Sequence, residues 1–219
     1  VKADPVSVIN VNYANWYNPE LDYKTYMVPG ILVVLVTMIG AFLSGMNVVK
    51  EKEIGTIEQL NVTPIKKYQF ITGKLLPFWI IGMGELMFGL ILGILVFKIP
   101  LLGNPLVIFM LASVYLVVVL GMGLLISTLT DTQQQAMFIA WFFLILFILM
   151  GGVFTPVESM PQWAQTIAFF NPVARFNSAM RMIMLKGSGL KDVLPAFYFF
   201  IVYGISLMSL AVWRYRKTE

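Results

Sequence analysis

The residues best able to do chemistry lie in one short polar segment, residues 50–67, with the sequence KEKEIGTIEQLNVTPIKK. The segment holds four lysines and three glutamates, and the chain on either side of it is almost free of charge. Charged side chains in such a setting form charge-assisted hydrogen bonds with a partner surface. The residues expected to do so are Glu51, Lys52, Glu53 and Glu58. Gly55 has no side chain, so another backbone can approach it closely.

Two residue types that dominate metal and catalytic sites are missing from the sequence. Without cysteine there are no disulfides or thiolate ligands, and without histidine the commonest general base is lost. No stretch fits GxxxxGK[ST], the loop that cradles nucleotide phosphates, so we expect no cofactor in this chain and no ATP hydrolysis by that route. The net charge is +4, but the basic residues are scattered, and we expect no nucleic-acid partner.

Glu85 is a second candidate, because it lies close to the middle of a long hydrophobic stretch. A carboxylate at that depth is costly, so it is expected to face the interior of a helix bundle or a wet cavity. One hypothesis makes Glu85 part of a transport path. The alternative is a structural hydrogen bond to a neighbouring span.

The elements that must position these residues follow from the composition. Hydrophobic residues make up 59% of the chain, charged residues 12%, and the mean hydropathy is +0.83. Soluble domains carry about 25% charged residues. We therefore predict an all-α polytopic membrane protein with five transmembrane helices. The spans are expected at about residues 28–49, 75–97, 106–129, 136–154 and 193–213.

The polar segment is predicted to be an amphipathic helix over about 50–64, outside the bilayer. Ile54, Ile57 and Leu60 recur at three-residue spacing and would share one face, while Glu51 and Glu58 would lie on another. A second amphipathic piece, residues 65–74, leads into the next span. The alternative is a solvated loop whose charges only keep it out of the lipid.

Residues 155–192 are too rich in proline for one long helix. We expect a short helix from Ser159 to Phe170, a break at Asn171-Pro172, and then an interfacial helix or half of a re-entrant pair. The apolar stripe of that last helix consists of Phe176, Ala179, Met180, Ile183 and Met184. The residues expected to face away from the stripe are Arg175, Ser178 and Arg181. In the earlier turn 130–135, Asp131 is a candidate helix cap.

Five spans place the 50–64 segment and the C-terminal tail on one side of the membrane. Residues 1–27, the 98–105 loop and the 155–192 region fall on the other side. The two sides carry eight and seven basic residues, so the charges next to span ends decide, and they place the 50–64 segment in the cytoplasm. Residues 1–27 are partly strand-like, and we expect them to be the end of a larger extracellular domain in a chain that is a fragment.

Several stretches resemble one known family in order and spacing. EKEIGTIEQLNVTP (51–64) and GKLLP (73–77) resemble the segment between the second and third spans of type 2 ATP-binding-cassette (ABC) export permeases. WYNPELDYKTYMVPG (16–30) resembles the entry to the second span. The later landmarks are TQQQAM (132–137), GGVFTPVESMP (151–161) and FFNPVARF (169–176).

This resemblance implies a six-span subunit whose first span and most of whose extracellular domain lie outside this chain. Two such permease subunits would pair, identical or not, each resting on a cytoplasmic ABC ATPase that carries ATP and Mg. The 50–64 segment would be the coupling helix that docks on the ATPase, and 155–192 would be extracellular re-entrant helices. The implied ATPase-coupling residues are Glu51, Lys52, Glu53, Gly55, Thr56, Glu58 and Gln59. Those of the substrate path or gate are Glu85, Asn171 and Pro172.

The leading hypothesis is therefore a permease subunit, not itself an enzyme, that exports a hydrophobic or amphipathic substrate across the bacterial cytoplasmic (inner) membrane. An ion- or proton-coupled carrier using Glu85 is the first alternative. A membrane assembly subunit without transport of its own is the second.

Overall fold

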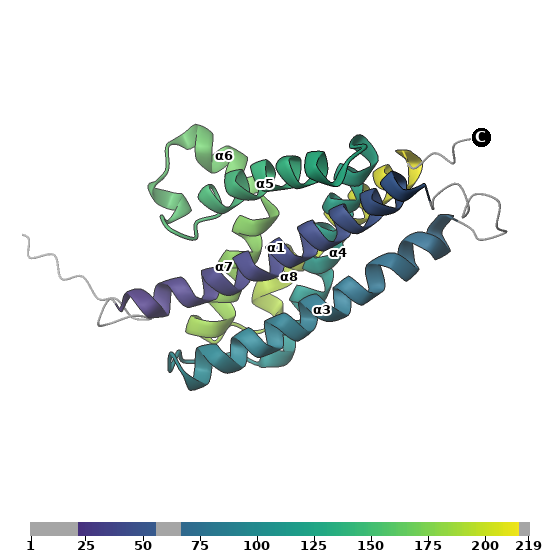
Figure 1. Cartoon of the computed structure of the whole chain (residues 1–219). Coiled ribbons are helices and arrows are strands. Elements are labelled where there is room, and N and C mark those ends of the chain that lie inside the picture. The colour runs from purple at the N-terminus through teal and green to yellow at the C-terminus, as the bar shows by residue number, and fades with distance from the viewer. Residues whose placement is uncertain (1–21, 56–66, 215–219) are drawn as a thin grey trace, which may run out of the picture.

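The computed structural model describes residues 22–55 and 67–214. The described residues are helical, with no strand among them. The helices are α1 (Tyr23–Ile54), α3 (Lys67–Leu95), α4 (Pro105–Leu129), α5 (Gln133–Leu149), α6 (Gln162–Phe170), α7 (Pro172–Lys186) and α8 (Leu190–Arg214), with a 3-10 turn at Val157–Ser159 (Figure 1). The predicted all-α class is confirmed in this part of the chain.

Helix α1 occupies the centre of the bundle. It packs against α3 on one side and α5 on the other, and α4 fills the space between α1 and α8 (Figure 1). The end of α1, the start of α3 and the turn between α4 and α5 lie together at one end of the bundle. That shared end holds Lys50 to Glu53, Lys74 and Asp131, the charged residues of the predicted polar segment and of the turns that face it.

An aromatic cluster joins four of the helices. The ring of Tyr115 (α4) stacks on Phe176 (α7) at 4.1 Å between centroids and meets Phe200 (α8) edge-on at 5.3 Å. The Tyr115 hydroxyl lies 2.6 Å from the Thr37 hydroxyl of α1, so this buried polar group has a partner. All five residues of the predicted apolar stripe in α7 are buried, which confirms that stripe.

Helices α1 and α4 cross at very short range. A Cβ atom added to Gly123 would lie 2.6 Å from the Ala41 carbonyl oxygen, so no larger residue fits there without moving the backbone. Small residues at helix crossings let backbones approach closely in membrane proteins. This crossing makes α1 and α4 the rigid centre to which the other helices attach.

Within the described part of the chain, four helices are long and apolar enough to cross a bilayer, namely α1, residues Gln69–Leu95 of α3, α4 and α8. The predicted spans 106–129 and 193–213 lie within α4 and α8. The predicted span 136–154 is wrong at its end, since α5 stops at Leu149 and Gly152 adopts a positive φ of 69°. With 17 residues, α5 sits at the lower limit for a spanning helix.

The polar segment is not a separate helix from residue 50 onward, which corrects the sequence prediction. Helix α1 runs without interruption to Ile54, because Lys50 to Glu53 are good helix formers and no glycine or proline lies between them and Gly55. Gly55 ends the helix at φ 79°, and its N–H is directed at the carbonyl oxygens of Glu51 and Lys52. Residues 56–64 lie outside the described part.

Two other boundaries also differ from expectation. Helix α3 already begins at Lys67, so the piece expected over 65–74 is, from residue 67 onward, the start of the spanning helix itself. Helix α6 begins at Gln162 rather than at Ser159, whose hydroxyl donates to the Pro156 carbonyl in a preceding 3-10 turn. The break at Asn171-Pro172 is confirmed.

Candidate functional site at the charged end of the bundle

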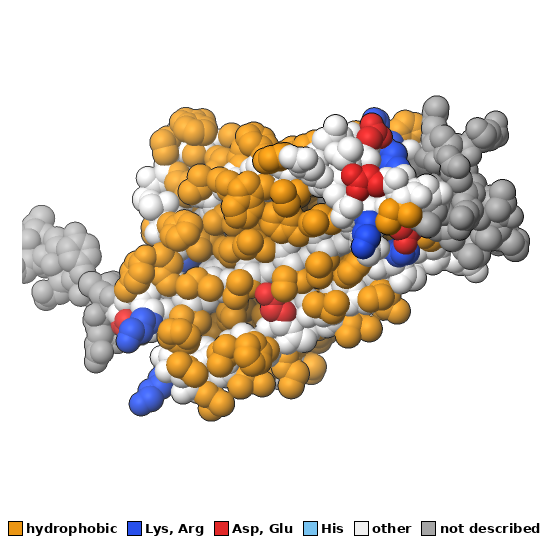
Figure 2. Space-filling model, in the orientation of Figure 1, with side chains coloured by type: hydrophobic (Ala, Val, Ile, Leu, Met, Phe, Trp, Pro, Cys, Tyr) orange, Lys and Arg blue, Asp and Glu red, His pale blue; other side chains and the backbone are white. Residues whose placement is uncertain are grey.

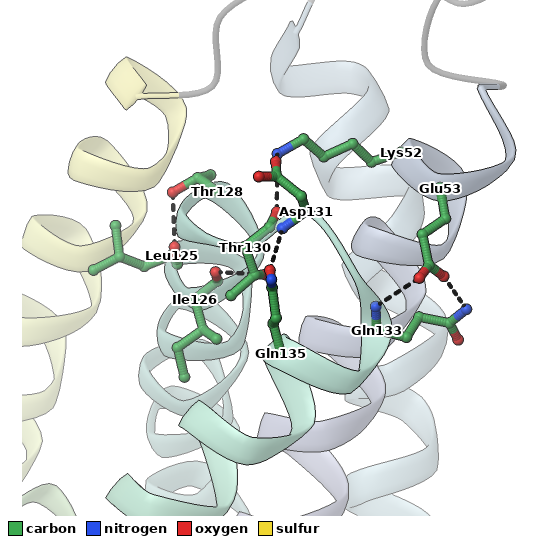
Figure 3. Close-up of polar contacts among 9 residues, drawn as sticks. All are labelled: Lys52, Glu53, Leu125, Ile126, Thr128, Thr130, Asp131, Gln133 and Gln135. Carbon is green, nitrogen blue, oxygen red and sulfur yellow. Dashed lines mark hydrogen bonds and ion pairs between the residues drawn. The ribbon is translucent and has the colours of Figure 1, made fainter.

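The last turns of α1 carry the charged residues singled out from the sequence, and they face the turn between α4 and α5. Figure 2 shows acidic and basic side chains close together at this end, while hydrophobic side chains cover most of the middle of the same face. The contacts of Lys52 and Glu53 with this turn are called the charged clamp below (Figure 3).

Lys52 forms the first half of the charged clamp. Its Nζ donates to the Thr130 carbonyl oxygen at 2.9 Å and pairs with Asp131 Oδ1 at 2.5 Å (Figure 3). The side chains are 41% and 81% exposed, so water and salt screen the pair. An ion pair of this kind holds two elements in register but adds little stability.

Glu53 forms the second half. Its Oε1 accepts from the backbone N–H of Gln133 at 3.1 Å, and its Oε2 accepts from Gln133 Nε2 at 2.5 Å (Figure 3). Gln133 is the first residue of α5, whose N–H groups have no partner within the helix. A carboxylate there also faces the positive end of the helix dipole. Helix α5 is thus capped by a residue of α1.

The turn itself is held by local hydrogen bonds. The N-cap of α5 is Thr132, whose hydroxyl accepts from the Gln135 N–H at 3.2 Å, and not Asp131 as the sequence suggested. Asp131 is pulled toward Lys52 instead, and its backbone N–H donates to Gln135 Oε1 at 3.1 Å. The Thr130 hydroxyl closes the end of α4 by donating to the Ile126 carbonyl oxygen at 3.1 Å.

Helix α3 meets the same end of α1 through an ion pair between Lys74 and Glu51. Beside this pair, an open hollow of about 760 Å³ lies on the surface next to the start of α3. Its described lining residues are Asn47, Gln69, Phe70, Gly73, Lys74, Pro77 and Phe78. Below the hollow, Val48 of α1 shares a buried cluster with Ile71 and Leu75 of α3, so α3 is packed on α1 at this end as well.

The coupling residues proposed from the sequence fall into two groups. Glu51, Lys52 and Glu53 are all bonded to other helices or turns of the same chain. Gly55 terminates α1, whereas the remaining three, Thr56, Glu58 and Gln59, lie outside the described residues. Sequence reasoning missed Asp131 and Gln133 as their partners. The available signal was only that Lys52 and Asp131, which carry opposite charges, lie in two polar segments between predicted spans.

Glu85 lies on α3 and is half-buried. It is the only acidic residue of that helix, whose other residues are mostly hydrophobic. Its Oε2 is buried and has no hydrogen-bond partner within the described part of the chain. The alternative of a structural hydrogen bond to a neighbouring span is therefore not seen there.

Asn171 and Pro172 are both buried and join α6 to α7. Asn171 Oδ1 accepts from the Val173 N–H at 2.9 Å, which caps α7, and Asn171 Nδ2 donates to the Phe147 carbonyl oxygen of α5 at 2.8 Å. Pro172 occupies the first position of α7, where a missing N–H costs nothing. Both residues thus shape the junction between α5 and α7, and their part in a substrate gate stays a prediction.

A second polar cluster, opposite the charged clamp, was not foreseen. Arg181 donates to the carbonyl oxygens of Gly152 at 2.8 Å and Val153 at 3.1 Å, and its guanidinium lies 3.8 Å from the centre of the Tyr26 ring. The Tyr26 hydroxyl also donates to the Gly152 carbonyl oxygen, at 3.3 Å. Asn177 Nδ2 donates to the Gly151 carbonyl oxygen at 3.0 Å. We call these contacts the carbonyl clasp.

The chemistry of both clusters is that of binding and positioning. Within residues 22–55 and 67–214 no group of three or more acidic side chains is arranged to hold a metal ion. The carbonyl clasp satisfies the backbone after α5, where the helix has ended and its carbonyl groups need donors. The charged clamp does the same for the N–H groups at the start of α5.

Comparison with known proteins gives the family. Residues 2–213 match the family described as ABC-2 family transporter protein. The chain is 34% identical over 203 residues to the "Probable multidrug ABC transporter permease YbhR" of Escherichia coli K12, covering 93% of this chain and 55% of that protein. It is 31% identical over 182 residues to YbhS of the same organism, a protein described in the same words, covering 83% of this chain and 48% of the relative.

A more distant relative is the "Linearmycin resistance permease protein LnrN" of Bacillus subtilis, 27% identical over 169 residues, 75% of this chain and 42% of that protein. The chain thus spans about half the length of the curated relatives it matches. No solved structure matches the chain significantly. With its apolar helices and a family match over nearly its whole length, the chain is a multi-pass membrane protein that belongs to the ABC-2 transporter family.

Proposed function

We propose that this chain is the membrane-spanning part of a permease subunit of an ATP-driven exporter. The observation that carries the proposal is the family match over residues 2–213, together with a charged end at which three helices and a turn of the bundle meet. ATP and Mg would be bound by a separate cytoplasmic ATPase, which converts hydrolysis into displacement of these helices.

In this proposal the segment after α1 is the contact with the ATPase. The contact with the partner is made by Gly55, Thr56, Glu58 and Gln59. Its displacement is transmitted to the other helices by Glu51, Lys52 and Glu53. The ion pairs and hydrogen bonds of these last three residues with the α4–α5 turn and α3 support this division of roles. A junction that transmits movement needs residues bonded to other helices, as these three are.

The proposed membrane arrangement has five spans, with α5 as the shortest. The charged end and the C-terminus lie in the cytoplasm, and α6 and α7 form re-entrant helices on the outer face of the bacterial inner membrane. A second permease subunit completes the transporter. The cargo is a hydrophobic or amphipathic molecule, a class suggested by the multidrug and linearmycin names of the relatives.

The coupling role is tested in vesicles containing the complete permease and its ATPase, with ethidium as the exported probe. Glu58→Arg and Gly55→Trp are expected to reduce ethidium export per ATP hydrolysed, because they change the charge and shape of the contact. Lys191→Glu, an exposed charge reversal at the start of α8, is the matched control. Unchanged export and hydrolysis in both contact variants would contradict the proposed coupling.

A carrier driven by ions or protons is the second candidate, favoured by the unpartnered Glu85 Oε2 within α3. It predicts ethidium movement without ATP in response to a pH gradient, abolished by Glu85→Gln. Export that requires ATP and survives Glu85→Gln would remove this candidate.

A further inference from the structure

Helix α5 buries only a narrow strip of its surface against the rest of the bundle. Its buried residues are Ala136, Ala140 and Leu144, spaced four apart along one edge, and two of them are alanines. The opposite face is exposed, with Phe138 and Phe142 each 61% accessible. The main packing partner of α5 is α1, where Val49 shares a buried cluster with Ala136 and Ala140. Burial alone therefore attaches α5 to α1 and to little else.

Both ends of α5 are additionally bonded to α1 or to residues that α1 touches. At the start, two consecutive residues of α1, Lys52 and Glu53, bond to Asp131 and Gln133. After its end, Gly152 accepts from the Tyr26 hydroxyl of α1 and from Arg181. The bidentate contact of Glu53 with the backbone and side-chain N–H groups of Gln133 fixes direction as well as distance.

The path of the chain makes this arrangement informative. The 56–66 segment is joined covalently to α1 and α3, so a displacement of it reaches those two helices directly. Helix α5 begins 78 residues after Gly55 and has no such link. The charged clamp and the packing of Ala136 on Val49 are the described contacts that join the start of α5 to the end of α1. Helix α3 is held to the same end of α1 by its ion pair with Glu51 and by the packing of Ile71 and Leu75 on Val48.

Building on the proposed function, we propose that the end of α1 and the start of α5 move as one body, with Asp131 and Gln133 as positioning residues that carry a displacement of α1 into α5. Helix α5 would thus follow α1 during export although no loop of the chain links the two helices.

The first measurement needs no ATPase and no cargo. Because the sequence has no cysteine, introduced pairs are the only labelling sites in this chain. Spin labels at Lys50→Cys and Gln134→Cys, both exposed, report the distance between α1 and α5 in the complete permease in nanodiscs. We expect a narrow distance distribution that becomes about twofold wider in Lys52→Asp or Asp131→Lys and narrows again in the double exchange, as expected of a coupled pair.

A second variant pair protects the result against misfolding. Glu53→Gln retains an acceptor oxygen for Gln133, and we expect the distribution to stay close to that of the unaltered protein. Glu53→Ala removes both acceptors and should widen it. A broad distribution in the unaltered protein, no effect of the single reversals, or no recovery in the double exchange would each overturn the inference.

The second measurement adds the ATPase and traps it with ATP and vanadate. The 50–134 distance should stay constant, because the end of α1 and the start of α5 are one body, and a change in this distance on trapping overturns the inference even if export is intact. Failure of the proposed function would appear separately, as export and hydrolysis that Glu58→Arg and Gly55→Trp leave unchanged, while the 50–134 distance still behaves as in the first measurement.

Discussion

The charged clamp and the carbonyl clasp hold the two ends of α5 by different means. At the start of α5 the contacts are one ion pair and several hydrogen bonds, made by exposed side chains of α1, and Asp131 is 81% exposed. Beyond its end the donors are partly buried and bind backbone carbonyl oxygens, as Arg181 and Asn177 do. One end is therefore bathed in water and salt, and the other is largely shielded from both.

This difference indicates which end of α5 is held by the weaker contacts. Exposed ion pairs contribute about 0–1 kcal/mol and weaken further with salt. Hydrogen bonds from a charged donor contribute about 1.5–3 kcal/mol, and leaving a buried carbonyl without one is costly. We therefore expect α5 to stay fixed at the carbonyl clasp. The end of α5 at the charged clamp is the one expected to be displaced, together with the end of α1.

Removing the centre of the carbonyl clasp should have the largest effect. Arg181→Ala takes away two donors and the contact with the Tyr26 ring, so we expect a loss of about 3 kcal/mol in the free energy of unfolding. The measurement is thermal unfolding of the purified permease in detergent, with the exposed Lys191→Ala as control. A loss no greater than that of the control would end the distinction between the two clusters.

Asn177→Ala tests the clasp at a single bond. Asn177 is 1% exposed and donates to the Gly151 carbonyl oxygen. Its removal leaves that carbonyl unsatisfied, and we expect a loss of about 1–2 kcal/mol by the same measurement. Ser178→Ala, on the exposed side of the same helix, serves as the control. Equal stability of the two variants would show that the hydrogen bond of Asn177 adds nothing to the free energy of unfolding.

Glu53→Ala should cost less, about 1 kcal/mol, which is the usual worth of a helix cap. Its effect is expected mainly in the first turn of α5, where Gln133 loses its acceptor. Hydrogen exchange of the N–H groups at residues 133–136 would show this as faster exchange than in the unaltered protein. Faster exchange spread evenly over α5 would instead indicate a general weakening of the helix.

Lys52→Ala is expected to have the smallest effect, about 0.5 kcal/mol, because its pair with Asp131 is exposed. Raising the salt concentration should remove the difference between this variant and the unaltered protein, whereas the deficit of Arg181→Ala should persist. A salt-resistant effect at Lys52 would show that the two ends are held alike.

Local patterns predicted the parts of this structure that depend on local causes. The hydrophobic runs of α4 and α8, the apolar stripe of α7 and the break at Asn171-Pro172 follow from periodicity and from proline, and all are present. The end of α1 was misplaced because the charged residues 50–53 were taken to mark a boundary. Charge decides where a helix leaves the lipid, whereas α1 ends only at Gly55, which adopts a left-handed conformation.

The candidate site was harder to predict because its partners meet only through tertiary packing. Lys52 and Asp131 are 79 residues apart, with two long helices between them. Arg181 binds backbone carbonyl oxygens, which every residue has, so no sequence pattern marks them. The expectation that Arg181 faces away from the apolar stripe missed that it would point at the backbone after α5.

The left-handed Gly55 has a mechanical consequence. Its φ of 79° stops the helical path of the backbone, so α1 is one uninterrupted helix from Tyr23 to Ile54. A helix of 32 residues is about 48 Å long. This single element therefore joins Lys52 of the charged clamp to Tyr26 of the carbonyl clasp.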